Sequence, residues 1–287
     1  MSFSAYHQAK DEPHPDHILS NHHGMLPQSY IQIVFKNKMF FYWHYIYIFM
    51  YLDELSTNEF KKRINKNTAV ILPVGIMEEH GAALPLCTDS LQSEHVAERV
   101  AGKIKGYILP SIRYGVCSST KNFPGSISLS FDTMRNLVYD ILSELVRNNV
   151  RKIAVISGHA GSMHMSAIRL SAEKIVDEYD VKIIVLSDYE LLYDEKGRKS
   201  LKRIGIPEWE RHGGAIETSR VMVSRPDLIK CKGKKSTPKI PKYHILKNPE
   251  KYFPEGIIGD PSTASKSKGE KITDFVVNEI VKLIKEM

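Results

Sequence analysis

The chain has 287 residues, of which 42% are hydrophobic, so it can bury a substantial core as one large α/β domain or two smaller ones. Its three cysteines lie far apart and form no C-x-x-C pair. This spacing argues against a disulfide framework and a zinc ribbon, and it indicates a reducing cytoplasm. The formal net charge of +7 favours binding of anionic partners.

Much of the positive charge lies between Lys230 and Lys251, where eight lysines alternate with Gly, Pro and polar residues. A solvated loop explains this composition, and so does attraction of an anionic, phosphorylated small-molecule substrate. Nucleic-acid binding is poorly supported, because only Tyr243 and Tyr252 offer aromatic rings for base stacking in this segment.

Residues 1–49 do not share the patterns of the rest of the chain. The first 23 residues hold five of the twelve histidines without periodicity, so we expect disorder there rather than a metal site. Residues 39–52 are apolar, but a membrane-spanning helix needs about 20 such residues, and no signal-peptide cleavage site follows. Residues 31–49 are rich in residue types with A/T-rich codons and resemble translated upstream sequence. We therefore expect a spurious extension and no membrane segment, and we take Met50 or Met39 as the natural start.

From Met50 onward, helical and strand patterns alternate. Ser56-x-x-Glu59 predicts a capping box for the first helix, and Asp132 is the predicted N-cap of the third. The inward face of that third helix is predicted to carry Leu137, Ile141, Leu142 and Leu145. The predicted helices cover residues 56–64, 89–104, 132–148, 162–179 and 270–285. The predicted strands cover residues 68–74, 107–112, 126–131, 152–157 and 181–186. This alternation implies one three-layer αβα domain over residues 50–287, with a mostly parallel central sheet.

Polar residues follow the predicted strands at their carboxyl ends, where α/β sheets bind ligands. Residues 75–89 read G-I-M-E-E-H-G-A-A-L-P-L-C-T-D. Glu78 and His80 are two residues apart, so in an extended chain they point to the same side, and Asp89 follows a loop containing Gly and Pro. Zinc, iron and manganese share carboxylate and imidazole ligands, so the stretch predicts a divalent metal site. An ordinary exposed loop explains the short pattern equally well.

Ordered sequence blocks resemble those of the creatininase family of metal-dependent amidohydrolases. Residues 73–89 resemble its P-x-G-S-x-E-Q-H-G-P-H-L-P-L-G-T-D motif. Three further blocks follow in the family's order: 123–127 (F-P-G-S-I) resembles F-P-G-T-I, 157–161 (S-G-H-A-G) resembles N-G-H-G-G-N, and 212–219 (H-G-G-A-I-E-T-S) resembles H-A-G-E-x-E-T-S. Residues 256–269 resemble the C-terminal block, so the resemblance covers roughly residues 52–287.

This resemblance implies a creatininase-like fold and a centre of two divalent metal ions. The implied ligands are Glu78, His80, Asp89 and His159, with Asp89 bridging the ions. The family's namesake has a glutamate two residues after the second histidine, where this chain has Gly161. Glu217 is the natural replacement, either as a ligand of the second ion or as a base for its water. His212 resembles the family histidine near the substrate, which implies that it stabilises an oxyanion or protonates the leaving nitrogen.

Departures from the family pattern bear on the substrate. Where many members carry an acid and a histidine before F-P-G, this chain has small residues. We assign the substrate wall to these residues, Cys117, Ser118, Ser119 and Thr120. The Trp-lined creatinine pocket has no clear counterpart, since Trp209 alone lies near His212. The chain thus resembles the archaeal branch of the family that removes formate from 2-amino-5-formylamino-6-ribosylaminopyrimidin-4(3H)-one 5'-monophosphate in flavin and deazaflavin biosynthesis. That branch implies Fe(2+) at one metal position and Zn(2+) or Mn(2+) at the second.

Two alternatives stay open at this stage. The chain can hydrolyse another cyclic or linear amide, as creatininase does, or it can be a non-catalytic module that keeps the fold and one metal ion. A serine hydrolase and a dinucleotide enzyme are disfavoured, because the sequence has no G-x-S-x-G elbow and no Gly-rich phosphate loop. The family resemblance also implies a homo-oligomer.

Overall fold

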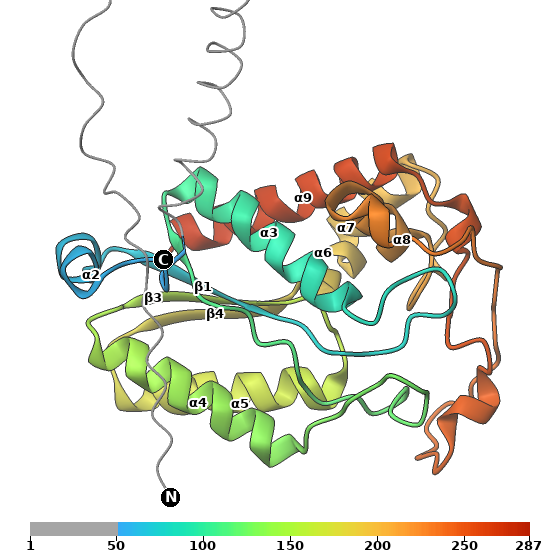
Figure 1. Ribbon diagram of the computed structural model, residues 1–287, viewed down its shortest axis with the longest axis horizontal. Coiled ribbons are helices and arrows are strands. Elements are labelled where there is room, and N and C mark those ends of the chain that lie inside the picture. The colour runs from blue at the N-terminus through green and yellow to red at the C-terminus, as the bar shows by residue number, and fades with distance from the viewer. Residues whose placement is uncertain (1–50) are drawn as a thin grey trace, which may run out of the picture. The chain divides into compact units, whose positions relative to one another are not determined.

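The computed structural model describes residues 51–287, and the predictions made for residues 1–50 lie outside that range. At the centre is a parallel sheet of four strands in the order β2-β1-β3-β4 (Figure 1). The strands are β1 (Ala69–Val74), β2 (Tyr107–Ile108), β3 (Lys152–Ser157) and β4 (Lys182–Ser187). The central pair, β1 and β3, runs in register from Ala69 beside Lys152 to Val74 beside Ser157. The prediction of a mostly parallel sheet is confirmed.

Helices cover both faces of this sheet (Figure 1). One face is covered by α4 (Phe131–Arg147) and α5 (Ser162–Glu178), and the other by α3 (Thr88–Ile104) and α9 (Lys266–Lys285). Strand side chains alternate between the two cores, so that Val155 packs in the core of α4 and α5 and Ile156 in that of α3 and α9. Because both faces are buried, the strands read as continuous apolar runs. The three-layer αβα architecture is therefore confirmed.

Shorter helical segments complete the described part of the chain. They are α2 (Thr57–Arg63), α6 (Asp188–Tyr193), α7 (Glu195–Arg203), α8 (Ala215–Ser224) and the 3-10 turns Pro226–Leu228, Pro249–Tyr252 and Pro261–Thr263. The capping box of Ser56 and Glu59 opens α2 as predicted. The sequence did not predict α7, because only Gly197 and Leu201 are buried and no apolar stripe results. Across residues 51–287, no helix combines the length and the apolar character that crossing a membrane requires.

One predicted strand is too long, and another is replaced by isolated bridges. The strand predicted at residues 107–112 ends after two residues, because Pro73 of β1 faces β2 without an N–H, and pairing resumes only where the Ile112 N–H donates to the Pro73 carbonyl at 3.1 Å. In place of the strand predicted at residues 126–131, Ile127 and Ser128 form only isolated bridges.

Three details of the helix predictions are also wrong. The N-cap of α4 is Ser130 and not Asp132, which lies inside the helix. Leu137 is 38% exposed, because the buried stripe of α4 passes through its neighbour Val138. The last helix begins at Lys266, earlier than the predicted residue 270, and is capped by the preceding serine. Short polar caps thus outweigh the apolar periodicity in deciding where these helices begin.

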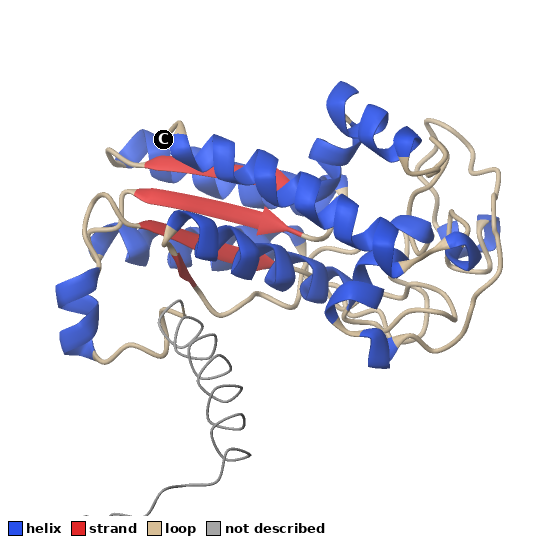
Figure 2. Ribbon diagram, turned by 90° about the horizontal axis from the view of Figure 1, so that it is seen from above, coloured by secondary structure: helices blue, strands red, loops and turns tan. Residues whose placement is uncertain are grey.

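The carboxyl ends of the strands point toward the end of the molecule where the long loops gather (Figure 2). There β1 and β3 meet the first turn of α3 through two glycines. A Cβ added to Gly158 would stand 2.1 Å from the backbone oxygen of Asp89, and one added to Gly75 would stand 2.4 Å from the backbone of Ser90. The Gly158 N–H also donates to the Val74 carbonyl at 2.9 Å. Only glycine permits this approach. It brings the segments that follow both strands against the start of α3.

The contact between Gly158 and α3 can be tested by one substitution. Gly158→Ala should lower the free energy of unfolding by at least about 1–3 kcal/mol, because the added methyl group has no room beside the Asp89 backbone. Urea denaturation measures this. Gly102→Ala is the matched control, since Gly102 is exposed within α3 and alanine there should stabilise by roughly 0.5–1 kcal/mol. Equal stability of the two variants would contradict the close approach.

Candidate metal centre

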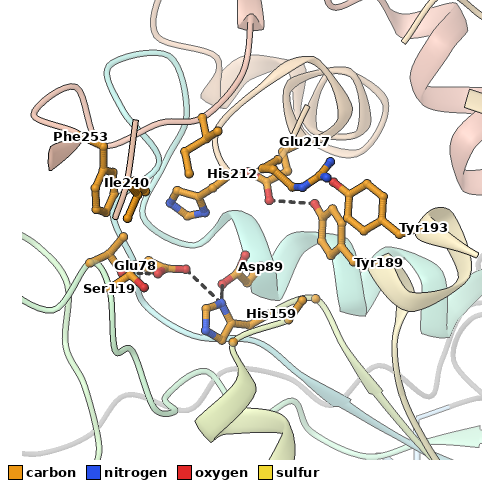
Figure 3. Close-up of a pocket in the computed structure, with 16 residues that line it drawn as sticks. Glu78, Asp89, Ser119, His159, Tyr189, Tyr193, His212, Glu217, Ile240 and Phe253 are labelled. Carbon is orange, nitrogen blue, oxygen red and sulfur yellow. Dashed lines mark hydrogen bonds and ion pairs between the residues drawn. The ribbon is translucent and has the colours of Figure 1, made fainter. Parts of the chain in front are cut away.

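Six polar side chains from four segments converge at the carboxyl edge of the sheet, and Figure 3 shows all of them except His80. They are Glu78 and His80 after β1, Asp89 in the first turn of α3, His159 after β3, and His212 and Glu217 around the start of α8. Their ligand atoms form three sets, each within 4.8 Å: Glu78, Asp89 and His159; His80, Asp89 and Glu217; and Glu78, His80 and His212. The structure therefore brings together all the residues proposed from sequence as metal ligands or catalytic groups.

The Asp89 carboxylate belongs to two of these sets. Its Oδ1 lies 3.1 Å from His80 Nε2, and its Oδ2 lies 3.2 Å from His159 Nδ1. The residue is only 1% exposed, so water cannot compensate its charge. Because each oxygen faces a different imidazole, one carboxylate can bind two ions at once.

The protein backbone fixes the tautomer of His80. Its Nδ1 lies 3.0 Å from the Glu78 carbonyl oxygen, which can only accept, so Nδ1 carries a hydrogen. In the neutral ring the Nε2 lone pair then faces Asp89 Oδ1 and, at 3.6 Å, Glu217 Oε2. A lone pair beside two carboxylate oxygens is repulsive unless a proton or a metal ion lies between them. Metal-binding histidines are held by such a hydrogen bond at the other ring nitrogen.

The second imidazole, His159, is also surrounded by carboxylates. Its Nδ1 lies 3.0 Å from Glu78 Oε2 and 3.2 Å from Asp89 Oδ2. Burial lowers the pKa of His159, but the two carboxylates outweigh burial and raise it to about 10. Glu78 Oε2 and Asp89 Oδ2 are buried and accept no hydrogen bond from the described residues. Buried polar atoms are normally paired, and a divalent cation that displaces the proton would pair both. The residues present therefore fit a metal ion.

Glu217 faces His80 with an oxygen that is already held in place. Its Oε1 accepts a hydrogen bond from the Tyr189 hydroxyl at 2.8 Å, and its Oε2 accepts one from the Gly213 N–H at 2.6 Å. Both bonds fix the orientation of the carboxylate. Of the two roles left open by the sequence, this geometry suits a ligand better than a base, because a base needs an oxygen free to take a proton.

His212 lies above this centre and contacts it. Its Nε2–H donates to the Glu79 carbonyl oxygen at 2.8 Å, and its ring lies 4.3 Å from the His80 ring, centre to centre. Burial lowers the pKa of His212, but nearby carboxylates, first of all Glu78, outweigh burial and raise it well above its ordinary value. A protonated His212 carries a second hydrogen on Nδ1, and the contact with the Glu79 carbonyl oxygen does not use that hydrogen. It can therefore act as a proton donor.

A cavity of about 250 Å³ lies over the ligand sets. Tyr189 and Tyr193 stand on one side of it, and Ile240 and Phe253 stand on the opposite side (Figure 3). Glu78, Asp89 and His159 lie between these walls, nearer the strands (Figure 3). Apolar and aromatic walls around a few polar groups are typical of a small-molecule site, and the rings suit a flat substrate.

The residues assigned to the substrate wall take two different places. Ser119 and Thr120 line the cavity, whereas Ser118 is exposed and Cys117 is buried. Cys117 Sγ lies 3.4 Å from Glu78 Oε1, and the Thr120 hydroxyl donates to the same oxygen. This loop therefore holds a candidate metal ligand in place as well as facing the cavity.

Several cavity residues were not found from the sequence, among them Tyr189, Tyr193 and Arg211. Tyr189 did have a signal, because a capping box that begins at Ser187 directly follows β4 at the ligand-bearing edge of the sheet. Tyr193 and Arg211 lie at the end of a short helix and in a turn, where no strand or helical periodicity marks them.

Comparison with known proteins agrees with this geometry. The model of the creatininase family, described as creatinine amidohydrolase, matches residues 53–284. Creatinine amidohydrolase from Pseudomonas putida is 31% identical over 251 residues, which are 83% of this chain and 96% of that protein. The mycofactocin precursor peptide peptidase of Mycobacterium ulcerans is 23% identical over 248 residues, 81% of this chain and 91% of that protein.

Two solved creatininase structures, a manganese form and a mutant of zinc–zinc type, are both 28% identical to this chain. The manganese form superposes with a TM-score of 0.74 over 83% of this chain and 98% of its own. The zinc–zinc mutant superposes with a TM-score of 0.73 over 82% of this chain and 97% of its own.

The hydrogen bond from Thr120 to Glu78 predicts an effect on metal affinity. Thr120→Val keeps the shape of the side chain but removes the donor, so the affinity for Mn(2+) should fall by roughly 10- to 100-fold. Titration of metal-stripped protein with Mn(2+) measures this. Ser118→Ala, which alters an exposed hydroxyl of the same loop, should bind Mn(2+) like the parent protein. Unchanged affinity in Thr120→Val would show that Glu78 is positioned without this bond.

Proposed function

Because the chain belongs to the creatininase family of amidohydrolases, we propose that it is a two-metal enzyme that removes formate from a formylamino-pyrimidine ribonucleotide. The single observation that carries the two-metal centre is the Asp89 carboxylate, whose oxygens face His80 and His159 separately. A protein with one structural ion would need only one of these donor sets. It would also not need an open cavity over them.

The residues divide into two ligand sets that share Asp89. Glu78, Asp89 and His159 would hold one ion, and His80, Asp89 and Glu217 the other. Two divalent ions at such a centre activate a water molecule and polarise the amide carbonyl. His212 would then donate the proton that the leaving nitrogen needs, from the ring nitrogen that does not contact Glu79. Tyr189 would hold the Glu217 carboxylate in its orientation.

For the metals we propose Fe(2+) at one position and Zn(2+) or Mn(2+) at the second. All the candidate ligand atoms are carboxylate oxygens or imidazole nitrogens, a set that these ions share. Cys117 is close by, but burial and the neighbouring Glu78 raise the pKa of its thiol to about 12. It therefore stays protonated and is a hydrogen-bond donor rather than a thiolate ligand.

For the substrate, a phosphorylated ribonucleotide with a flat ring agrees with the aromatic walls, with the hydroxyls of Ser119 and Thr120, and with the lysine-rich segment 230–251. Hydrolysis of another cyclic or linear amide is the second candidate, favoured by the relatives that act on creatinine and on a peptide.

We also propose a cytoplasmic homo-oligomer. All three cysteines are free thiols, and Tyr243 and Ile245 are fully exposed apolar side chains available for a contact with another copy.

Metal content distinguishes the roles of the ligands. Asp89→Ala should lose both ions, because each donor set depends on that carboxylate, whereas Glu217→Gln should keep about one ion per chain. Anaerobic purification followed by elemental analysis measures this. Asp227→Ala, which removes an exposed carboxylate near α8, is the control and should keep the parent metal content. Two ions retained in Asp89→Ala would rule out the shared carboxylate.

The substrate is tested by offering the iron-loaded protein three compounds: the formylamino-pyrimidine nucleotide, creatinine and formamide. We expect the parent protein to release formate from the nucleotide and to hydrolyse little creatinine or formamide. Asp89→Ala should release no formate from the nucleotide. Quantification of formate and of the deformylated product measures the reaction. Turnover of creatinine without formate from the nucleotide would overturn the deformylase proposal, although it would leave a metal amidohydrolase.

A further inference from the structure

One cationic side chain stands in the cavity wall apart from the metal ligands. Among the described residues that line the cavity, Arg211 is the only lysine or arginine. It directly precedes His212 in the chain, so the turn that places the proton donor also places this guanidinium. The lysine-rich segment 230–251 contributes only Ile240 to the cavity. Lys235 instead lies over the Trp209 ring, at 4.6 Å from its centre.

The guanidinium of Arg211 is held rigidly. Its Nη1 donates to the carbonyl oxygens of Glu208 and Glu210, at 2.6 Å each, and its Cζ lies over the Tyr193 ring, 4.6 Å from the ring centre. The Tyr193 hydroxyl donates to the same Glu210 carbonyl at 2.9 Å, which ties the ring to the turn. A stacked and anchored arginine presents its remaining N–H groups in a fixed direction.

No carboxylate of the described residues neutralises this cation. Glu210 is the nearest acid in sequence, but its side chain is buried and accepts the backbone N–H groups of Ala215 and Asp260 instead. Arg211 forms no ion pair with any acid between residues 51 and 287. An oriented guanidinium without a counter-ion, in the wall of a reaction cavity, is suited to an anionic group of the substrate.

We infer that Arg211, stacked on Tyr193, is the specificity residue that binds the substrate's phosphomonoester. This inference rests on the proposed function for the identity of the phosphate. It assigns phosphate recognition to Arg211, and the lysines of segment 230–251 contribute only a diffuse positive field. A field of that kind raises the encounter rate, whereas a planar fork gives a defined contact with two phosphate oxygens.

The test uses ribose 5-phosphate as the probe, with ribose as its neutral match, and the full-length, metal-loaded protein. Calorimetric titration should show binding of ribose 5-phosphate and none of ribose. Arg211→Gln should weaken that binding by roughly 10- to 100-fold, and Arg211→Lys should weaken it less, since the charge stays but the fork is lost. Arg203→Gln removes an equal charge from the exposed surface of α7 and should change binding by less than about twofold. The paired change Lys234→Gln and Lys235→Gln should also leave binding within about threefold.

Several results would overturn the inference. They are failure of the parent protein to bind ribose 5-phosphate at millimolar concentration, equal binding of ribose, and unchanged binding in Arg211→Gln. Binding that disappears on chelation and ignores Arg211→Gln would place the phosphate on the metals and would also overturn it. Metal content and thermal unfolding of each variant check that the fold is intact, and Arg211→Lys keeps the test decisive if Arg211→Gln is unstable.

The same variants separate this inference from the proposed function. In the deformylase assay, Arg211→Gln should raise KM for the nucleotide and leave kcat nearly unchanged, because a remote phosphate is bound equally in ground and transition states. If no formate is released but ribose 5-phosphate binding still depends on Arg211, the substrate proposal fails and the anion site stands. If formate is released with the parent KM in Arg211→Gln, the anion site fails and the function stands.

Discussion

The structure depends on the burial of three carboxylates, those of Glu78, Asp89 and Glu217, in one site. Negative charges in an apolar interior are costly unless cations or hydrogen-bond donors pair them. The imidazoles of His80 and His159 can pair them only by carrying a proton or by sharing a metal ion. The Glu78 carbonyl accepts the hydrogen bond of the His80 Nδ1–H, and Nε2 is therefore the ring nitrogen turned toward two carboxylate oxygens. The centre is thus arranged for cations.

Bringing these charges together requires segments that are distant in the chain. A parallel sheet achieves this, because consecutive strands end at the same edge and place their following residues side by side. The glycines at 75 and 158 let that edge approach α3 closely enough for Asp89 to lie between the two histidines. Glu217 reaches the site from a helix on the C-terminal side, through the Gly213 N–H that holds its carboxylate. Close backbone packing is therefore part of how the ligand set is built.

A feature could be predicted from the sequence when the residues that cause it lie close together in the chain. The ligands after β1 and β3 could be predicted, because a buried strand followed by Glu, His or Gly-His is visible in a short window of sequence. The central strands β1 and β3 and the helices that cover them could be predicted for the same reason. Helix starts were less predictable: Ser130 rather than Asp132 caps α4, since the choice depends on backbone angles that periodicity does not encode. Tyr193 and Arg211 could not be predicted as a pair, because only the fold brings a helix end against a distant turn.

The loop that contains Cys117 and Thr120 serves both the cavity wall and the metal centre. Ser119 and Thr120 line the cavity, and Cys117 and Thr120 donate hydrogen bonds to Glu78. A substitution that changes the substrate wall here therefore also changes the orientation of a candidate metal ligand. The apolar side chains of Ile240 and Phe253 carry no such link, since they line the cavity without a hydrogen bond to the described ligands. Substrate preference can thus vary on the wall of Ile240 and Phe253 at little cost to the metal centre, while variation at Thr120 alters both together.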